Sequence, residues 1–401
     1  MKIGILTYHW VSNFGANLQT LSTVNYFKKK GYNPLVINWV PYDLEKAYVK
    51  NTKNIQLKEH KQFGSMYLPM SRICRNKQDI ANVIKEENIE AMVLGSDAIF
   101  SYLPILSRIR PSRHKYWIYT QPYADRKFPN PFWGDFLDII DIPTVILSAS
   151  AQNFNFLQVK LSFRKKQFAK HIRRFKYISV RDVWTNKMVQ HFASDLSPSV
   201  TPDPVFAFNN NAQVAYLTKQ DILAKYNLPE NYVLISVNGD IFHADKVNAL
   251  SKRFKENGAL LIEIPRANQV SNLSIEKRID LPIPPIDWYY LIKYSFGYIG
   301  ELMHPIIVSL HNSVPFFSFD TYGYSKDGTL NKDSSKIYQI LNRFDMLDNY
   351  YNKLLNKSVP NVDAIYEAIM NFDKEKCSKL AAESYLDYKK MMQNIITAIK
   401  K

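Results

Sequence analysis

The sequence predicts an α/β protein with two halves that meet near residue 210 and a helical tail. Three observations carry this prediction. Short apolar runs alternate with amphipathic stretches of helical spacing on both sides of residue 210. The alternation breaks at 199–216, where Pro, Ser and Asn cluster as they do in loops and linkers. The length of 401 residues suits two domains.

The first half begins with its most regular unit. A strand at 3–6 precedes an amphipathic helix with apolar residues at 18, 21, 24 and 27, which stops at Gly31, and a second strand follows at 34–38. This β-loop-α-β order implies a parallel sheet. The same rhythm predicts strands at 91–94, 143–150 and 177–180 and helices at 79–87, 158–175 and 186–192. Residues 95–97 read as a turn after the strand at 91–94.

The second half repeats the alternation after the linker. It predicts strands at 232–237, 259–264, 296–299 and 314–319, helices at 244–257, 287–295 and 305–311, and tail helices at 337–341, 362–372 and 378–400. We therefore divide the chain into an N-terminal domain at 1–210, a C-terminal domain at 211–375 and a C-terminal helix at 376–401. We expect this last helix to pack back on the N-terminal domain.

Charge and cysteine content narrow the class of protein. The chain has 52 Lys and Arg residues against 36 Asp and Glu residues, a formal net charge of +16. Its basic surface suits nucleic acid, an anionic membrane or a phosphorylated small molecule. Two cysteines cannot build a disulfide framework or a cysteine zinc site, and no apolar run reaches 18 residues. These features predict a cytoplasmic protein with reduced thiols and no transmembrane helix.

Candidate site residues follow the strands of the first half, because ligands of such sheets bind beyond the carboxyl ends of strands. Asn13 and Gly15 open the first helix, where close backbone approach and the helix N-terminus favour an anion. Ser96 and Asp97 follow the next strand, and Arg181 follows the strand at 177–180, where it could bind a carboxylate or phosphate. The alternatives are a simple helix-opening turn, an ordinary N-cap and a surface ion pair of Arg181 with the adjacent aspartate.

The second half supplies three more candidates. Glu301 and His304 follow the strand at 296–299 and precede a helix, and Lys326 lies beyond the strand at 314–319. His304 fits either an acid/base role or a structural role near a helix start. Asp203 before Pro204 reads as a turn. The histidines show no metal-ligand spacing, and we expect no metal or other cofactor.

Two segments carry much of the positive charge. Residues 108–133 interleave six cations with aromatic side chains, and the predicted helix at 158–175 is strongly basic without an acidic residue. Such a helix can be an ordinary solvated face. Both segments also suit an anionic membrane interface or a lipid-linked sugar, and the first could bind single-stranded nucleic acid.

Five pieces together resemble the polysaccharide pyruvyl transferase family over nearly the whole chain. They are ILTYHWVSNFGANLQTLS (Ile5–Ser22), VLGSDAIF (Val93–Phe100), SVRD (Ser179–Asp182), TPDPVF (Thr201–Phe206) and YIGELMHPIIVSLHNSVPFFSFDTYGYSK (Tyr298–Lys326). Their order and spacing carry the resemblance, since no single piece is decisive.

The resemblance implies a GT-B-like fold in which two Rossmann-like domains face a cleft, with the acceptor on the N-terminal and the donor on the C-terminal side. It implies transfer of pyruvate from phosphoenolpyruvate to two hydroxyls of a sugar, forming a cyclic ketal. The family's essential His falls on His304 and its motif Arg on Arg181. The expected partners are phosphoenolpyruvate, a lipid-linked glycan and the inner face of an anionic membrane, without nucleic acid.

One position departs from the family pattern. Some members have an Arg two residues before the essential His, and this chain has Leu302 there. Arg181, Lys326 or a cation from elsewhere would then have to hold the anionic donor, beside Glu301. Two alternatives stay open: a GT-B glycosyltransferase that uses a nucleotide sugar, and a glycan-binding protein without catalysis.

Overall fold

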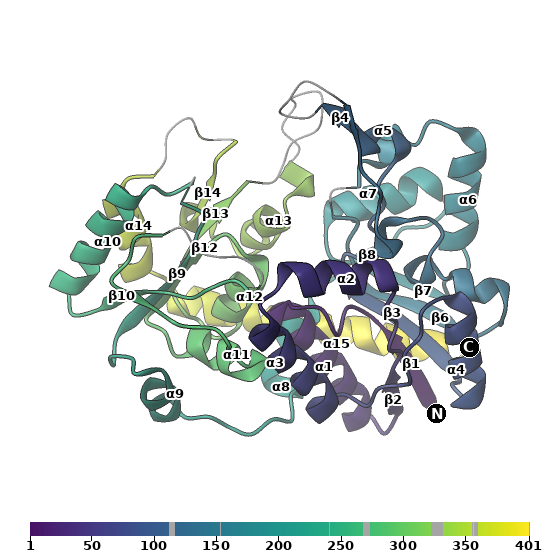
Figure 1. Cartoon of the computed structure of the whole chain (residues 1–401), viewed down its shortest axis with the longest axis horizontal. Helices are drawn as coiled ribbons and strands as arrows, with labels where there is room; N and C mark the ends of the chain where they lie inside the picture. The colour runs from purple at the N-terminus through teal and green to yellow at the C-terminus, as the bar shows by residue number, and fades with distance from the viewer. Residues whose placement is uncertain are drawn as a thin grey trace.

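The computed structural model describes residues 1–111, 117–152, 154–239, 241–267, 273–321, 332–354, 356 and 360–400. Two six-stranded sheets lie in separate halves of the molecule, and helices cover both (Figure 1). The first sheet has the order β2-β1-β3-β6-β7-β8, and all its pairs are parallel. Its strands are β1 (Lys2–Leu6), β2 (Asn33–Val36), β3 (Ala91–Asp97), β6 (Thr144–Ala149), β7 (Tyr177–Val180) and β8 (Ser199–Val200).

The second sheet has the order β11-β10-β9-β12-β13-β14 and is also parallel. Its strands are β9 (Tyr232–Ser236), β10 (Leu260–Glu263), β11 (Lys277–Arg278), β12 (Gly297–Gly300), β13 (Phe316–Asp320) and β14 (Tyr350–Asn352). Near-continuous burial of these strands is what a sheet covered on both faces requires. The predicted α/β architecture with two parallel sheets is confirmed.

The helices of the first half alternate with its strands. They are α1 (Phe14–Lys29), α2 (Tyr42–Asn51), α3 (Asn54–Tyr67), α4 (Lys77–Glu86), α5 (Ile105–Arg108), α6 (Ser162–Ile172) and α7 (Val183–Phe192). A small antiparallel hairpin, β4 (Ile109–Pro111) and β5 (Trp117–Tyr119), follows α5. Single 3-10 turns are η1 (Ala124–Arg126), η2 (Pro131–Trp133), η3 (Asp135–Asp138) and η4 (Phe156–Gln158).

The connection between the halves and the second half contain the remaining helices. They are η5 (Pro204–Ala207), α8 (Phe208–Asn211), α9 (Lys219–Tyr226), α10 (Ala244–Glu256), α11 (Pro285–Lys293), α12 (Met303–His311), η6 (Lys332–Ser334), α13 (Lys336–Arg343), η7 (Leu347–Asn349), α14 (Val362–Met370) and α15 (Lys374–Ile399). The long helix α15 contacts α12 of the second half and also β6 and β7 of the first sheet. It therefore packs against both halves of the molecule (Figure 1).

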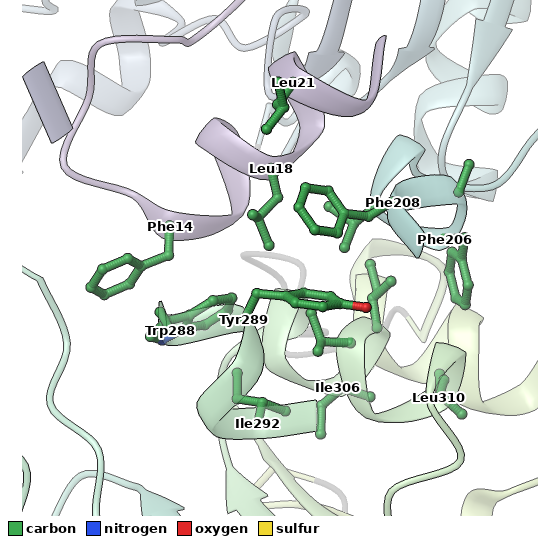
Figure 2. Packing of buried hydrophobic residues seen from close by; sticks show 14 of the residues in the cluster. Phe14, Leu18, Leu21, Phe206, Phe208, Trp288, Tyr289, Ile292, Ile306 and Leu310 are labelled. Atoms are coloured by element: carbon green, nitrogen blue, oxygen red, sulfur yellow. The ribbon is translucent and has the colours of Figure 1, made fainter. Parts of the chain in front are cut away.

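The two halves share one continuous apolar core. Helix α1 is buried along its length because it lies between its own sheet and helices α11 and α12. Figure 2 shows Phe14 and Leu18 of α1 facing Trp288 and Tyr289 of α11, with Phe208 beside them. The rings of Phe14 and Trp288 stack with centroids 5.1 Å apart. This packing holds the strand ends of the two sheets in a fixed relation.

A buried polar contact adds specificity to the same interface. The side chain of Gln56 on α3 donates to the carbonyl of Ile283 at 2.9 Å and accepts from the amide of Ile283 at 2.8 Å. The Nδ1 atom of the His60 ring lies 2.6 Å from Asn17 Oδ1 on α1, and its Nε2 lies 3.1 Å from Gln56 Nε2. Burial lowers the pKa of His60 to about 3, so this histidine stays neutral and structural.

Several predicted boundaries differ from the structure, and three of the differences have a packing reason. The segment 199–216 contains β8, η5 and α8, because Phe206 and Phe208 enter the shared core. The predicted helix at 158–175 begins only at Ser162, since η4 forms a separate turn that packs Phe156 against Trp184. Residues 95–97 extend β3, and a Cβ at Gly95, whose φ is +120°, would lie 2.2 Å from a backbone oxygen of β6.

Helices α2 and α3 were not predicted from the sequence. Helix α2 lies on the surface, and within its ten residues Leu44 is the one fully buried side chain. A helix that buries so little has no clear apolar period to recognise.

Candidate active site

The carboxyl ends of β3 and β7 and the N-terminal end of α12 meet between the two sheets. They bring Asp97, Arg181, Asp203 and His304 into one cluster. Arg181 Nη1 donates to Asp203 Oδ2 at 2.7 Å, and Arg181 Nη2 donates to Asp97 Oδ1 at 3.1 Å. His304 Nε2 lies 3.9 Å from the same oxygen of Asp203, beyond hydrogen-bond distance. Arg181 and His304, far apart in the sequence, therefore both lie next to the carboxylate of Asp203.

Arg181 does not form the surface pair with Asp182 that the sequence left open. Its side chain is 2% exposed, and its partners are Asp97 and Asp203. Asp182 instead caps α7 by accepting from the amide of Thr185 at 2.7 Å. Burial alone would lower the pKa of Arg181, but the carboxylates of Asp203 and Asp97 outweigh it and raise that pKa. Arg181 is a permanent charge in this site.

Burial sets the protonation state of His304. It lowers the pKa of the imidazole below its usual value, while Asp203 and Asp97 pull the pKa upward and only partly compensate. The ring is therefore neutral at pH 7 and able to accept a proton. Asp97 shows the opposite balance: burial would raise its pKa, but Arg181, Lys336 and His304 hold it below the usual value.

Asp203 is the centre of the cluster, although the sequence predicted only a turn at this position. Its Oδ2 accepts from Arg181 and from Gln19 Nε2 of helix α1, and its Oδ1 accepts from the amide of Val205 at 2.9 Å. The side chain is wholly buried. Asp203 thus caps the 3-10 turn η5 and joins α1, β7 and the region of α12. Its sequence signals were the Asp-Pro pair and its place in the TPDPVF piece (Thr201–Phe206) that resembles the family.

Three buried polar atoms of this cluster are unpartnered within the part of the chain that the structure describes. They are His304 Nε2, Arg181 Nε and Gln19 Oε1. Buried polar atoms of folded proteins nearly always have a hydrogen-bond partner. His304 and Arg181 thus each keep one ring or guanidinium nitrogen with hydrogen-bonding capacity that a ligand can use.

The absence of a side chain at Gly15 lets the His304 ring pack against the start of α1. A Cβ at position 15 would lie 2.0 Å from Cγ and 2.1 Å from Nδ1 of His304, so the imidazole packs directly on the backbone of the helix start. Asn13 caps this helix, with its Oδ1 accepting from the amide of Ala16 at 3.2 Å. The close approach at Gly15 is made here by a side chain of the other half, and the predicted anion at this helix start stays a prediction.

A cleft of about 350 Å³ opens beside His304. Both halves line it: Asn13 and Gly15 from the first, and residues that follow β9, β10 and β12 from the second. Arg266, just beyond β10, lines this cleft and was missed by the sequence analysis. Its Nη2 lies 3.1 Å from Glu301 Oε2, while Glu301 Oε1 accepts from the amide of Asn238. Glu301 therefore orients a cation of the cleft.

Lys336 is a second missed cation, at the first turn of α13. Burial lowers its pKa to about 8, with a further lowering contribution from Arg181, against the attraction of Asp97, Asp182 and Asp203. It lies close enough to His304 to lower the pKa of that ring as well. No sequence motif marks Lys336, because its proximity to Asp97 arises only from the way the two halves pack.

One predicted site residue, Ser96, is not brought to this cluster. The Ser96 hydroxyl is buried in the first sheet and donates to the carbonyl of Ser148 at 2.8 Å. Its side chain therefore serves the β3–β6 connection. Lys326 lies outside the described residues. Among the described residues, no group of three or more His, Cys, Asp or Glu side chains could hold a metal ion.

The chain is similar in sequence to one protein family. The sequence profile of the family described as polysaccharide pyruvyl transferase matches residues 13–322, most of the chain. No curated protein matches the chain in sequence.

Similar solved structures share the fold across nearly their full lengths. UGT89C1 of Arabidopsis thaliana, solved with quercetin, has a TM-score of 0.52 at 8% identity, with 99% of each chain covered. The UDP-N-acetylglucosamine 2-epimerase of Rickettsia bellii has a TM-score of 0.50 at 11% identity, covering 100% of this chain and 96% of its own. At such low identity these likenesses report the GT-B fold alone. With this fold and a family match that includes both Arg181 and His304, the chain belongs to the polysaccharide pyruvyl transferase family.

Proposed function

We propose that this protein transfers pyruvate from phosphoenolpyruvate to a sugar of a cell-surface polysaccharide or of its lipid-linked precursor. The observation that carries the proposal is the neutral His304, packed on Gly15 with an open Nε2, next to Arg181 with an open Nε. A general base and a cation with unfilled hydrogen-bonding capacity suit an anionic substrate and a hydroxyl that must lose a proton. Family membership supports the same chemistry.

The reaction balances with the groups at hand. One sugar hydroxyl adds to C2 of phosphoenolpyruvate, a proton is delivered to C3, which becomes the methyl group, and the C2–O bond to phosphate breaks. The second hydroxyl then adds to C2, and its proton leaves with inorganic phosphate. His304 accepts a hydroxyl proton and can return it to C3, as a single base in a cleft allows. We propose no metal or redox cofactor for this sequence of steps.

The donor's negative charge needs cations other than Arg181 alone. Asp97 and Asp203 carry two negative charges against the single positive charge of the Arg181 guanidinium. In the position where some family members have an Arg, this chain has Leu302, which lines the cleft as an apolar residue. We propose that Arg266 and Lys336 supply the missing charge, from β10 and α13 respectively. Fixed cations of this kind stabilise a carboxylate and a phosphate without reorganisation.

A lipid-linked acceptor would place the reaction at the cytoplasmic face of a membrane. We propose such a peripheral location. No described helix is long and apolar enough to cross a bilayer. Nucleic acid is not proposed as a partner.

Ligand-induced stabilisation separates this proposal from a nucleotide-sugar transferase of the same fold. A ligand at 100 times its dissociation constant stabilises the folded state by about 2.7 kcal/mol. We expect phosphoenolpyruvate to raise the melting temperature and UDP-sugars to leave it unchanged. Stabilisation by nucleotide sugars and not by phosphoenolpyruvate would contradict the proposal. Binding of glycans without any release of phosphate would favour a protein that binds glycan without catalysis.

A further inference from the structure

The start of helix α6 presents an apolar surface to solvent. Leu157, Leu161 and Phe163 are 51%, 59% and 55% exposed. They lie within seven residues, whereas Phe156, Val159 and Phe168 of the same segment are buried and hold it to the fold. Figure 1 shows α6 at the outer edge of the first half, away from the second sheet. The segment is therefore anchored by one face and displays a second apolar face outward.

Cations surround this apolar face. Lys160 and Lys166 are exposed, and Arg164 places its guanidinium 5.6 Å from the centre of the Phe163 ring. Within the described part of the chain, the cations at 160, 164, 165, 166 and 170 form no ion pair with a carboxylate. Farther along, Arg173 pairs with Asp195 and Arg174 with Asp138. Four of these five unpaired cations, at 160, 164, 165 and 166, thus lie at the end of the segment that carries Leu161 and Phe163.

The position of these cations is unfavourable for the helix itself. The N-terminal end of a helix carries a partial positive charge and prefers acidic residues. Helix α6 has none in its first turn, and Leu161 at the N-cap position makes no side-chain cap. Arg164, Lys165 and Lys166 therefore repel the helix dipole as well as one another. An external anionic partner would relieve this repulsion.

A second exposed pair lies next to the same segment. Ser107 Oγ of α5 donates to Gln158 Oε1 at 2.7 Å, which ties the β4–β5 hairpin to η4. Ile109 and Tyr119 are paired across this hairpin and are both exposed. The two basic segments noted in the sequence are thus joined in space.

We infer that the α6 surface, defined by Leu157, Lys160, Leu161, Phe163, Arg164 and Lys166, docks on a bilayer that contains anionic phospholipid. Apolar side chains enter the headgroup boundary while lysines and arginines stay at the phosphate level. Two of the three exposed apolar residues are leucines, which offer no ring for stacking a nucleobase, so single-stranded nucleic acid fits this face less well. The inference rests on the proposed function only for its purpose, delivery of the enzyme to a lipid-linked acceptor.

Vesicle flotation of the full chain tests the surface without any substrate. Wild-type protein is expected to float with vesicles of phosphatidylglycerol and phosphatidylcholine and to remain unbound with phosphatidylcholine alone. The double variant Leu161→Asp/Phe163→Asp, and separately Lys160→Glu/Lys166→Glu, should each lose on the order of tenfold in binding. The matched control is Leu386→Asp on α15, where the leucine is 57% exposed.

Two readouts keep the outcome clear. Melting temperature establishes that each variant folds, and phosphate release with a soluble acceptor should be unchanged in all of them. Equal binding of the variants and the control would overturn the inference, as would loss of affinity for a single-stranded oligonucleotide without any effect on vesicles. Vesicle binding without pyruvyl transfer by wild-type protein would instead refute the proposed function and leave the docking surface standing.

Discussion

The imidazole of His304 rests on the backbone of Gly15, so closely that a Cβ at position 15 would lie 2.0 Å from His304 Cγ. The contact joins the first helix of one half to the catalytic candidate of the other. It makes the position of His304 depend on the relative placement of the two halves, which the stacked Phe14 and Trp288 rings help to fix.

Substitution Gly15→Ala should displace the His304 ring and lower turnover. A shift of about 1 Å in a catalytic group can cost on the order of 100-fold in rate. We expect a loss of this size in phosphate release from phosphoenolpyruvate. The control is Gly64→Ala in α3, where a new Cβ would find Met70 at an ordinary 3.6 Å. Equal activity of the two variants would show that the contact does not position His304.

The substitution Asp203→Asn should have two separate effects, one on the stability of the fold and one on proton transfer by His304. Loss of the buried carboxylate leaves Arg181 with Asp97 as its remaining charged partner, and we expect the free energy of unfolding to fall by about 3 kcal/mol. Asp203 also raises the pKa of His304. Its removal lowers that pKa further, so the acid limb of the pH–rate profile should move to lower pH. An unchanged acid limb in a folded variant would contradict a role for Asp203 beside His304.

Loss of the charge on Lys336 should weaken the binding of phosphoenolpyruvate at alkaline pH. Its pKa of about 8 means that its charge is present below pH 8 and is lost as pH rises through that value. We therefore expect KM for phosphoenolpyruvate to rise above about pH 8. Lys336→Arg should keep the charge and remove this rise, while Lys336→Met should raise KM below about pH 8 and approach the wild-type value above it. An identical KM profile for wild type and Lys336→Arg would exclude Lys336 as its source.

We expect Arg266 to bind the anionic donor in place of the arginine that some family members have at the position of Leu302. Arg266→Ala is expected to raise KM for phosphoenolpyruvate by about tenfold or more, the size of a lost charge-assisted hydrogen bond. Adding Leu302→Arg to this variant should restore binding, since the new cation projects from the α12 side of the same cleft. Arg253→Ala, on the exposed face of α10, serves as the control. Failure of the double variant to recover would mean that the two positions are not interchangeable.

Arg181 follows β7 of the first sheet and His304 follows β12 of the second. The order of strands and helices therefore predicted that each lies beyond the carboxyl end of a strand in its own half. The family resemblance implied that the two halves face one cleft. Ser96 shows the limit of this reasoning: it lies at a strand end, but its side chain turns toward Ser148 in the sheet. Strand alternation separates it from Asp97, whose side chain reaches Arg181.

The remaining site residues depend on contacts that no local pattern records. Gln19 lies inside a helix and reaches Asp203 across 184 positions of sequence. Lys336 and Arg266 enter from elements whose neighbours are set by the packing of the two halves. Asp203 lies in the TPDPVF piece that resembles the family, but its local sequence predicts only a turn, and its burial beside Arg181 shows its place in the cluster.

Incubation of the protein with phosphoenolpyruvate and a panel of lipid-linked and soluble oligosaccharides tests the proposed pyruvyl transfer. Phosphate release and product mass are followed together. We expect acceptor-dependent phosphate release, a product that carries a pyruvate ketal, and loss of both in His304→Ala and Arg181→Ala. Full phosphoenolpyruvate-dependent activity in both variants would contradict this proposal.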